Sequence, residues 1–248
     1  MDLIQALLLG ALQGITEWLP VSSSGHLVLV QHFFGVSASV FFYVALHLGT
    51  LAAVALFFRR QIVDLFLRER KMLVLLVLAS IPAALAGFLL RDFFASLFSS
   101  VLAVGIAFVF TGCLLYATKR ASGNNGLNAR NSLLIGLLQA VSIIPGVSRS
   151  GATISAGLLA GVEKKKATTF SFLLSIPVIL GAAAFEAWKG LAFEPNLTPV
   201  FVGVVAAFVV GFASIGWLLK LIEKKEFYVF AFYCWLVGAV AVVAALLG

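Results

Sequence analysis

The sequence carries little charge for its length. Asp, Glu, Lys and Arg make up 11% of its 248 residues, against about 25% in ordinary soluble domains. Hydrophobic residues make up 62%, and the mean hydropathy is +1.12. A water-soluble fold of this size could not cover so much apolar surface with so few polar side chains. The composition therefore excludes a soluble globular domain and predicts an integral membrane protein whose partner is the lipid bilayer.

Cysteine is almost absent as well. The only two cysteines, Cys113 and Cys234, both lie inside apolar runs, which excludes a disulfide framework and a cysteine-based metal site. The net charge of +7 comes without a basic patch interleaved with aromatic residues, because the Lys and Arg residues flank the apolar runs. Nucleic acid is therefore not expected as a partner.

Long apolar runs are what the sequence does have. Six of them reach the roughly 20 residues that a helix needs to cross a bilayer. They span residues 40–58, 71–90, 98–118, 167–188, 198–219 and 227–247. A helix satisfies all its backbone hydrogen bonds within one segment, as lipid requires. We therefore predict an all-α integral membrane protein with six transmembrane helices.

The segments that flank these runs divide sharply by charge. All but three of the Lys and Arg residues lie in alternate flanking segments, namely Arg59, Arg60, Arg68, Arg70, Lys71, Lys119, Arg120, Arg130, Lys164, Lys165, Lys166, Lys220, Lys224 and Lys225. Of the other three, Arg91 and Lys189 lie in the intervening loops, and Arg149 lies within apolar sequence. Because cytoplasmic loops are enriched in Lys and Arg, we predict that the basic loops are cytoplasmic and that both termini lie on the outer side.

Two further apolar stretches, 1–36 and 131–162, do not fit this alternation. Each is long enough to enter the membrane, but a cluster of Pro, Gly and Ser interrupts it. A full crossing by either stretch would break the alternation of charge. We therefore predict that each forms a re-entrant pair of half-helices around a polar turn, because irregular backbone at that depth must line a cavity or be covered by protein.

The two interrupted stretches are related in sequence. Residues 7–25, LLLGALQGITEWLPVSSSG, align without gaps with residues 133–151, LLIGLLQAVSIIPGVSRSG. Three crossings separate the copies, so the second copy is expected to be inverted relative to the first. We predict one membrane domain, 1–248, with a first repeat over 1–118 and an inverted second repeat over 131–247. In such architectures the polar turns meet near the midplane and form the binding site.

The first polar turn, QGITEWLPVSSSGH, carries groups that are typical of catalysis. Gln13 and Glu17 are four residues apart and share one helix face, and a carboxylate within the membrane needs a partner or a metal. A serine cluster follows, and His26 lies within one turn of it. The serines are Ser22, Ser23 and Ser24. A hydroxyl, an imidazole and a carboxylate can supply a nucleophile, a proton shuttle and a metal ligand.

The second polar turn, PGVSRSGAT, is suited to an anion. Arg149 is the one basic residue placed at depth, and its planar fork of donors matches phosphate oxygens. A helix N-terminus adds free N–H groups. The hydroxyls of this turn belong to Ser148, Ser150 and Thr153. The two turns together predict a site for a phosphate or diphosphate with a divalent cation.

The cation is expected to be a hard one. Glu17 would bind it, and Gln13 could assist through its carbonyl oxygen. Mg²⁺ prefers such oxygen ligands together with substrate phosphates, and Ca²⁺ is the other candidate. Zinc fits less well, because one His and one Glu fall short of the usual three protein ligands.

Simpler interpretations stay open for the same residues. Serines in membrane helices often bond only the backbone or pack as small residues. Glu17 and Arg149 could form a structural ion pair across the repeat interface. His32 and His47 read as interfacial or packing residues. A transporter or flippase for an anionic lipid or solute would use the same inverted repeat, and a purely structural membrane scaffold is a third interpretation.

At these residues the sequence resembles the bacterial undecaprenyl-diphosphate phosphatase family, the type linked with bacitracin resistance. QGITEWLPVSSSGH is close to the glutamate-rich first motif of that family, and PGVSRSGAT is close to its second. The length and the pattern of spans match over the whole chain. One departure is Gln13, where many relatives have Glu, and it leaves one fewer negative charge for a metal.

The resemblance implies a hydrolase that converts undecaprenyl diphosphate to undecaprenyl phosphate and phosphate. This reaction recycles the lipid carrier for peptidoglycan synthesis and gives bacitracin resistance. The resemblance also implies dependence on a divalent cation, and a multi-pass protein of the bacterial plasma (inner) membrane whose active site faces the outer side. The oligomeric state is left open, with a homodimer among the alternatives.

The resemblance also implies roles for individual residues. Glu17 with Gln13 would bind the cation, Ser23 would be the nucleophile or a phosphate ligand, and His26 would activate Ser23 or protonate a leaving group. Arg149 would hold the diphosphate. The hydroxyls expected to help it are those of Ser22, Ser24, Ser148, Ser150 and Thr153. Attack by a covalent nucleophile and attack by water both stay open, and the short spacing from Ser23 to His26 favours the covalent route.

Overall fold

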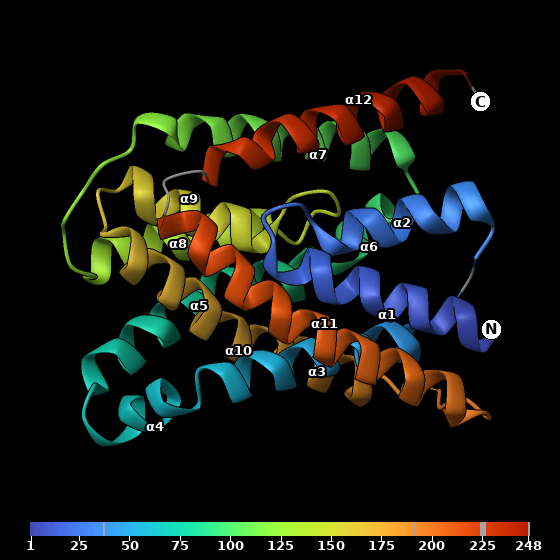
Figure 1. The fold of residues 1–248 in the computed structure, drawn as a ribbon, viewed down its shortest axis with the longest axis horizontal. Helices are drawn as coiled ribbons and strands as arrows, with labels where there is room; N and C mark the ends of the chain where they lie inside the picture. Colours follow the sequence, from blue (N-terminus) through green and yellow to red (C-terminus); the bar gives the residue numbers. More distant parts are fainter. Residues whose placement is uncertain (37, 191, 224–226, 248) are drawn as a thin grey trace.

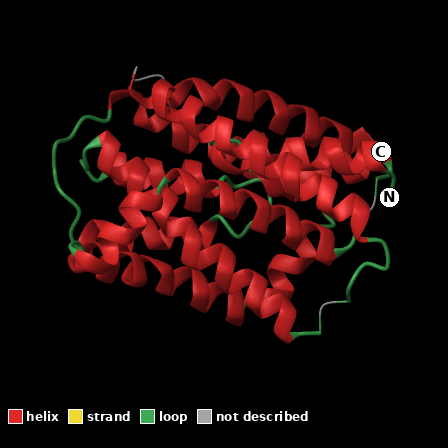
Figure 2. Ribbon diagram, turned by 60° about the horizontal axis from the view of Figure 1, so that its bottom comes forward, coloured by secondary structure: helices red, strands yellow, loops and turns green. Residues whose placement is uncertain are grey.

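The computed structural model describes residues 1–36, 38–190, 192–223 and 227–247, and these residues form a helical protein without a β-strand (Figure 2). Two short 3₁₀ turns and one isolated bridge, between Asn125 and Val162, supplement the helices. The α-helices are α1 (Leu3–Trp18), α2 (Ser23–Phe34), α3 (Val40–Phe57), α4 (Arg59–Leu67), α5 (Arg70–Leu89), α6 (Arg91–Leu97), α7 (Val101–Ala117), α8 (Ala129–Val141), α9 (Arg149–Leu159), α10 (Lys164–Trp188), α11 (Leu197–Glu223) and α12 (Phe230–Leu247).

The predicted all-α fold with six crossings is confirmed. Within the described residues, six helices are long and apolar enough to cross a membrane, namely α3, α5, α7, α10, α11 and α12. The bounds differ from the prediction by a few residues where local chemistry decides them. For example, α7 begins at Val101 because the Ser100 hydroxyl accepts the N–H of Ala103 at 3.2 Å and caps the helix. Lys224 and Lys225, assigned to the last basic loop, lie outside the described residues.

Each of the two interrupted stretches forms a pair of helices around an irregular break. The first break separates α1 from α2, and the second separates α8 from α9. At the first break Ser22 has a φ of 64°, the left-handed region that L residues rarely adopt, and its hydroxyl caps α2 by accepting the N–H of Gly25. Strained backbone of this kind is common at functional sites. The depth of the breaks in a bilayer stays a prediction.

Helices of the two halves pack on one another in a matching way. A Cβ at Gly10 of α1 would lie 2.2 Å from the carbonyl oxygen of Gly203 on α11, and a Cβ at Gly136 of α8 would lie 2.5 Å from that of Ala79 on α5. Gly10 and Gly136 occupy the same position in the two aligned stretches. Small residues of this kind let membrane helices approach closely. The inversion and the repeat boundaries stay predictions that this reciprocal packing supports.

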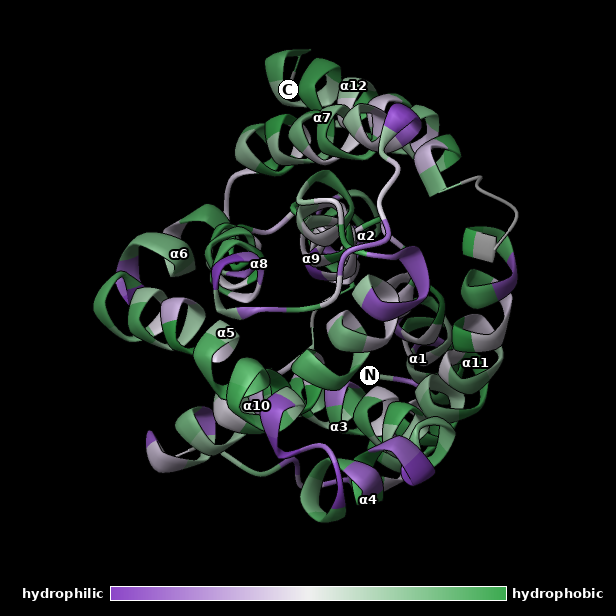
Figure 3. Cartoon of the chain, turned by 90° about the vertical axis from the view of Figure 1, so that its left-hand side faces the viewer, coloured by the Kyte–Doolittle hydropathy of each residue, from purple (hydrophilic) through white to green (hydrophobic). Residues whose placement is uncertain are grey.

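Charge and termini are distributed along the long axis. Both chain ends lie at one end of the molecule, and α4 lies at the opposite end (Figure 1). At the end of the molecule that faces the viewer in Figure 3, hydrophilic residues gather in α4, in the loops and at helix ends, whereas the long helices are mainly hydrophobic. Arg91 and Lys189, the two basic residues assigned to the other side, line one and the same cavity of about 360 Å³. The assignment of the two ends to the two sides of a membrane stays a prediction.

Candidate active site

The two helix breaks contact each other directly. The Ser22 hydroxyl accepts the backbone N–H of Gly146 at 3.1 Å, and the Ser150 hydroxyl donates to the carbonyl oxygen of Leu19 at 3.0 Å. Gly25 makes the approach possible, because a Cβ there would lie 2.9 Å from the Cα of Gly146. The polar turns, distant in the sequence, therefore form one site.

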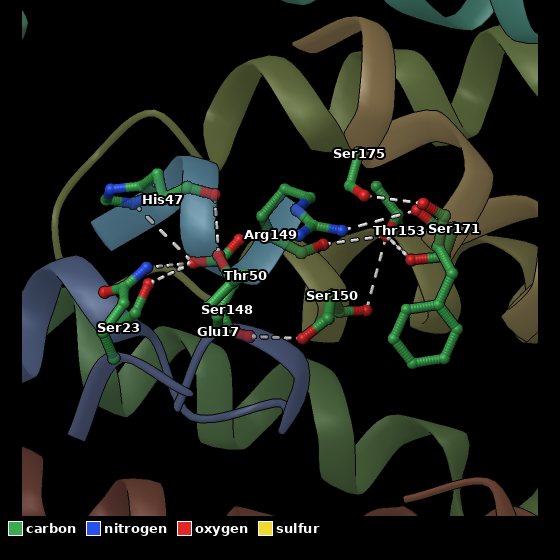
Figure 4. A network of polar contacts seen from close by, with 12 residues as sticks. Glu17, Ser23, His47, Thr50, Ser148, Arg149, Ser150, Thr153, Ser171 and Ser175 are labelled. Carbon is green, nitrogen blue, oxygen red and sulfur yellow. Dashed lines mark hydrogen bonds and ion pairs between the residues drawn. The ribbon is translucent and has the colours of Figure 1, made fainter. Parts of the chain in front are cut away.

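The Glu17 carboxylate is the centre of this site (Figure 4). Its Oε1 accepts a hydrogen bond from Arg149 Nη2 at 2.8 Å. Its Oε2 accepts from the Ser23 hydroxyl at 2.7 Å and from Gln13 Nε2 at 3.1 Å. A buried carboxylate needs such compensation, because its transfer from water is costly. One carboxylate thus joins the candidate nucleophile to the candidate phosphate ligand.

Arg149 is held in place on several sides. Its guanidinium lies over the Trp18 ring, 5.3 Å from the centroid, and Nη1 donates to the carbonyl oxygen of Ser171 at 3.4 Å. The Arg149 side chain is 13% exposed. The structural ion pair with Glu17, considered above as a simpler interpretation, is present. Ser23 and Gln13 bond the same carboxylate, so the ion pair does not exclude a catalytic role for Glu17 and Arg149.

His47 is one residue beside the site that the sequence analysis did not assign to it. Its Nε2 lies 3.7 Å from Glu17 Oε2 (Figure 4). Its Nδ1 bonds the carbonyl oxygen of Tyr43 at 2.8 Å. The expectation that His47 is a packing or interfacial residue did not place it beside Glu17, where the structure has it. A signal was available, because an ionisable residue within an apolar crossing is rare and commonly functional. His32 is exposed on α2, in agreement with an interfacial role.

His26 lies beside the site but does not contact Ser23 through a hydrogen bond. Its Nδ1 bonds the carbonyl oxygen of Ser22 at 2.7 Å, and its Nε2 bonds the Tyr233 hydroxyl at 2.7 Å. Its ring stacks on Tyr233 and meets the edge of Phe108. The expected activation of Ser23 by His26 does not match this geometry. His26 lies three positions after Ser23 on α2, and at this position its imidazole points towards α7 and α12. The group that accepts the Ser23 hydroxyl is Glu17.

The other hydroxyls expected to bind the diphosphate are bonded to the protein. Ser22 and Ser148 cap α2 and α9 by accepting the N–H groups of Gly25 and Gly151, respectively. The Ser24 hydroxyl lies 3.4 Å from that of Ser22, and the Ser150 hydroxyl lies 3.2 Å from that of Ser148. Thr153 bonds Ser171 at 2.6 Å. Diphosphate binding by these five hydroxyls stays a prediction, and it requires these bonds to exchange.

Residues on distant helices support both breaks. Ser171 on α10 contacts Thr153 as described, and Thr111 on α7 donates to Gly146 and accepts from the N–H of Ser148. Tyr233 on α12 contacts His26. The sequence contained no signal for these three, because hydroxyl residues are common in membrane helices and their partners lie far along the chain.

The residues expected to hold a divalent cation are suited to one. Glu17 offers its carboxylate, and the Oε1 atom of Gln13 is buried without a hydrogen-bond partner. An orphaned buried acceptor is costly, and a cation would satisfy it. Among the residues that the structure describes, no three or more His, Cys, Asp or Glu side chains form a metal cluster. Substrate oxygens would therefore have to complete the coordination, as is usual for Mg²⁺.

Comparison with known proteins gives one consistent result. Residues 6–240 match the family model described as bacitracin resistance protein BacA. A protein of Desulforapulum autotrophicum is 40% identical, with 98% of this chain and 99% of its own length aligned, and one of Methanobrevibacter smithii is 40% identical over 97% and 96%. A third, of Korarchaeum cryptofilum, is 39% identical over 96% and 97%, and all three carry the name undecaprenyl-diphosphatase. The chain therefore belongs to the bacitracin resistance protein BacA family.

Proposed function

We propose that the protein hydrolyses undecaprenyl diphosphate to undecaprenyl phosphate and phosphate, and so recycles the lipid carrier of cell-wall peptidoglycan synthesis. The observation that carries this proposal is the chain of contacts from Ser23 through Glu17 to Arg149, with 2.7 Å and 2.8 Å between the bonded atoms. It unites a nucleophile, an acid–base group and a phosphate ligand. The names of the relatives support the same reaction, and resistance to bacitracin fits the family.

Each residue of this chain of contacts has a distinct task. Ser23 is the nucleophile for the terminal phosphorus, and Glu17 orients its hydroxyl and is the proton acceptor within reach. Arg149 binds the phosphoryl oxygens with those of its five donors that Glu17 and Ser171 do not use, and stabilises the charge that develops on them. His26, held by Tyr233, lies close enough to the serine cluster to act on the leaving group after a change of partner.

The divalent cation is part of the proposal. Glu17 and Gln13 would hold it, and when bound it neutralises charge on the diphosphate and on the leaving phosphate. Mg²⁺ is the expected ion and Ca²⁺ the alternative. The Gln13 side chain contributes no negative charge, so the substrate must supply more of the attraction than in relatives with Glu at this position.

The membrane setting of the proposal follows from charge. We propose that the protein lies in the plasma membrane with its basic loops in the cytoplasm, and that its termini and active site face outwards. The apolar tail of the lipid would lie along the hydrophobic helix faces while its diphosphate reaches the polar breaks. A homodimer stays an expectation that cross-linking in membranes can test.

Phosphate release tests the enzymatic proposal. Purified protein in detergent, with Mg²⁺ added, is expected to release inorganic phosphate from undecaprenyl diphosphate, and EDTA is expected to stop the release. A protein that binds the lipid but releases no phosphate with any divalent cation would contradict the proposal.

A transporter or flippase for an anionic lipid is the alternative function. The reciprocal packing of α1 on α11 and of α8 on α5 favours it as much as it favours an enzyme. The hydrogen bond between Ser23 and Glu17 favours chemistry, because transport needs no nucleophile. Counterflow of labelled lipid in vesicles, without phosphate release, would support the alternative.

A further inference from the structure

We propose that His47 is a ligand of the divalent cation, so that the site consists of His47 Nε2, Glu17 Oε2 and Gln13 Oε1. The proposal rests on the function proposed above and names the metal chemistry of the same site. It starts from the approach of His47 to Glu17, 3.7 Å between Nε2 and Oε2.

The hydrogen bond on the far side of the ring fixes the tautomer of His47. Nδ1 lies 2.8 Å from the carbonyl oxygen of Tyr43, which can only accept, so Nδ1 carries the proton. In the neutral imidazole Nε2 then has a free lone pair, and this lone pair faces the carboxylate. Histidines that bind metals almost always donate their other ring N–H to a carbonyl or carboxylate in this way.

The distance between the two atoms suits a shared ion. At 3.7 Å, Nε2 and Oε2 are too far apart for a hydrogen bond. Two metal–ligand bonds of about 2.1 Å each can span up to about 4.2 Å. The side chain of His47 is 32% exposed, so an ion can approach it from outside the buried network.

Gln13 provides the second, independent observation. Its Nε2 donates to Glu17 Oε2 at 3.1 Å, while its Oε1 is buried with no partner. Rotation of the Gln13 amide would exchange the positions of Nε2 and Oε1 and turn Oε1 towards the Glu17 carboxylate. Two acceptors facing each other are stable only with a cation between them, and such a cation would also satisfy the orphaned oxygen.

The other two histidines do not meet these conditions. Nε2 of His26 bonds the Tyr233 hydroxyl at 2.7 Å, so its lone pair is engaged. His32 is exposed on α2, and its ring contacts Phe33. An imidazole ligand favours transition metals, whereas Ca²⁺ is bound by oxygen. A site of one imidazole and two oxygen ligands therefore accepts Mn²⁺, which can serve as the probe ion.

Pulsed electron paramagnetic resonance of bound Mn²⁺ tests the proposal. The wild-type protein in detergent, loaded with Mn²⁺ and inorganic pyrophosphate, is expected to show coupling to an imidazole nitrogen. Labelling with ¹⁵N-histidine should change this coupling. His47→Gln should abolish it and weaken Mn²⁺ binding at least about tenfold, whereas the matched control His32→Gln should leave both unchanged. Coupling that persists in His47→Gln would overturn the proposal.

Two further measurements keep the test decisive. Should His47→Gln fail to fold, histidine coupling that survives in both His26→Gln and His32→Gln belongs to His47, and its loss in either one overturns the proposal. Phosphate release is measured on the same wild-type preparation. If phosphate is released but Mn²⁺ shows no coupling to a histidine nitrogen, or binds independently of Glu17, the proposal that His47 is a ligand is overturned and the proposed function is not. Nitrogen coupling without release overturns the proposed function alone.

Discussion

Arg149 Nη2 lies 2.8 Å from Glu17 Oε1, and this single ion pair joins the two broken helix pairs at the centre of the protein. Both side chains are largely buried, at 13% and 7% exposure. Removal of one partner of a buried pair leaves an uncompensated charge. The pair therefore links the two halves of the chain, and it also places the positive charge of Arg149 where an anionic substrate can bind.

Arg149→Lys should inactivate the enzyme without unfolding it. The substitution keeps the positive charge beside Glu17 but removes the planar fork that binds two phosphate oxygens. We expect phosphate release to fall by about 10² to 10³-fold, the usual cost of losing a donor that stabilises developing charge. The matched control is Arg68→Lys, an exposed residue at the end of α4, which should keep full activity. Equal activity of the two variants would contradict the role of Arg149.

Ser23→Ala should abolish turnover while the protein still binds its substrate. The variant removes the hydroxyl 2.7 Å from Glu17 Oε2, and with it the proposed nucleophile. Phosphate release should drop by at least about 10³-fold. Brief incubation with labelled substrate should trap a phosphoserine in the wild type but not in Ser23→Ala. Ser99→Ala, at an exposed serine after α6, is the control. Turnover that survives in Ser23→Ala would establish direct attack by water.

Gly25→Ala should separate the two helix breaks. A Cβ at residue 25 would lie 2.6 Å from the Phe108 ring and 2.9 Å from the Cα of Gly146, so the methyl group cannot be accommodated without movement. We expect a loss of about 1–3 kcal/mol in the free energy of unfolding, seen as a lower melting temperature in detergent. Gly181→Ala has no neighbour within 4 Å of the new Cβ and should melt at or above the wild-type temperature. An unchanged melting temperature for Gly25→Ala would show that the breaks do not pack as described.

Tyr233→Phe tests the role of His26. The substitution removes the hydroxyl 2.7 Å from His26 Nε2 but keeps the stacked ring. If Tyr233 holds the imidazole for action on the leaving group, kcat should fall several-fold while KM stays nearly the same. The fall corresponds to the loss of one hydrogen bond of about 1 kcal/mol. Tyr228→Phe, whose ring contacts Tyr116 and Lys119, should leave kcat unchanged. A rise in KM alone for Tyr233→Phe would assign the tyrosine to lipid binding instead.

Cysteine labelling tests the orientation in the membrane. A cysteine in place of Lys165, at the start of α10, should resist an impermeant thiol reagent in intact cells and react after the cells are opened. Cys113 is exposed in the structure and Cys234 is buried, so both native cysteines are replaced first. Reaction at residue 165 in intact cells would reverse the proposed orientation.

The helical class and the six membrane-length helices could be predicted from the sequence because they depend on local properties. Apolar length specifies a crossing, and the clusters of Pro, Gly and Ser specify the breaks after α1 and α8. Gln13, Glu17 and Ser23 could be assigned to one site for a similar reason, since a few residues along the chain determine their proximity. The short helices α4 and α6 were not predicted, because they lie in segments that read as loops between crossings.

The sequence by itself determined that this is a membrane protein with two related polar breaks, and that one break carries a carboxylate and the other a guanidinium. The tertiary structure alone decided which groups surround that carboxylate. It brought His47 of α3 to Glu17 and turned His26 towards Tyr233 of α12. The physical reason is that a hydrogen-bond partner depends on the rotation and crossing of packed helices. Those are determined by side-chain contacts between residues far apart in the chain, such as Gly10 with Gly203.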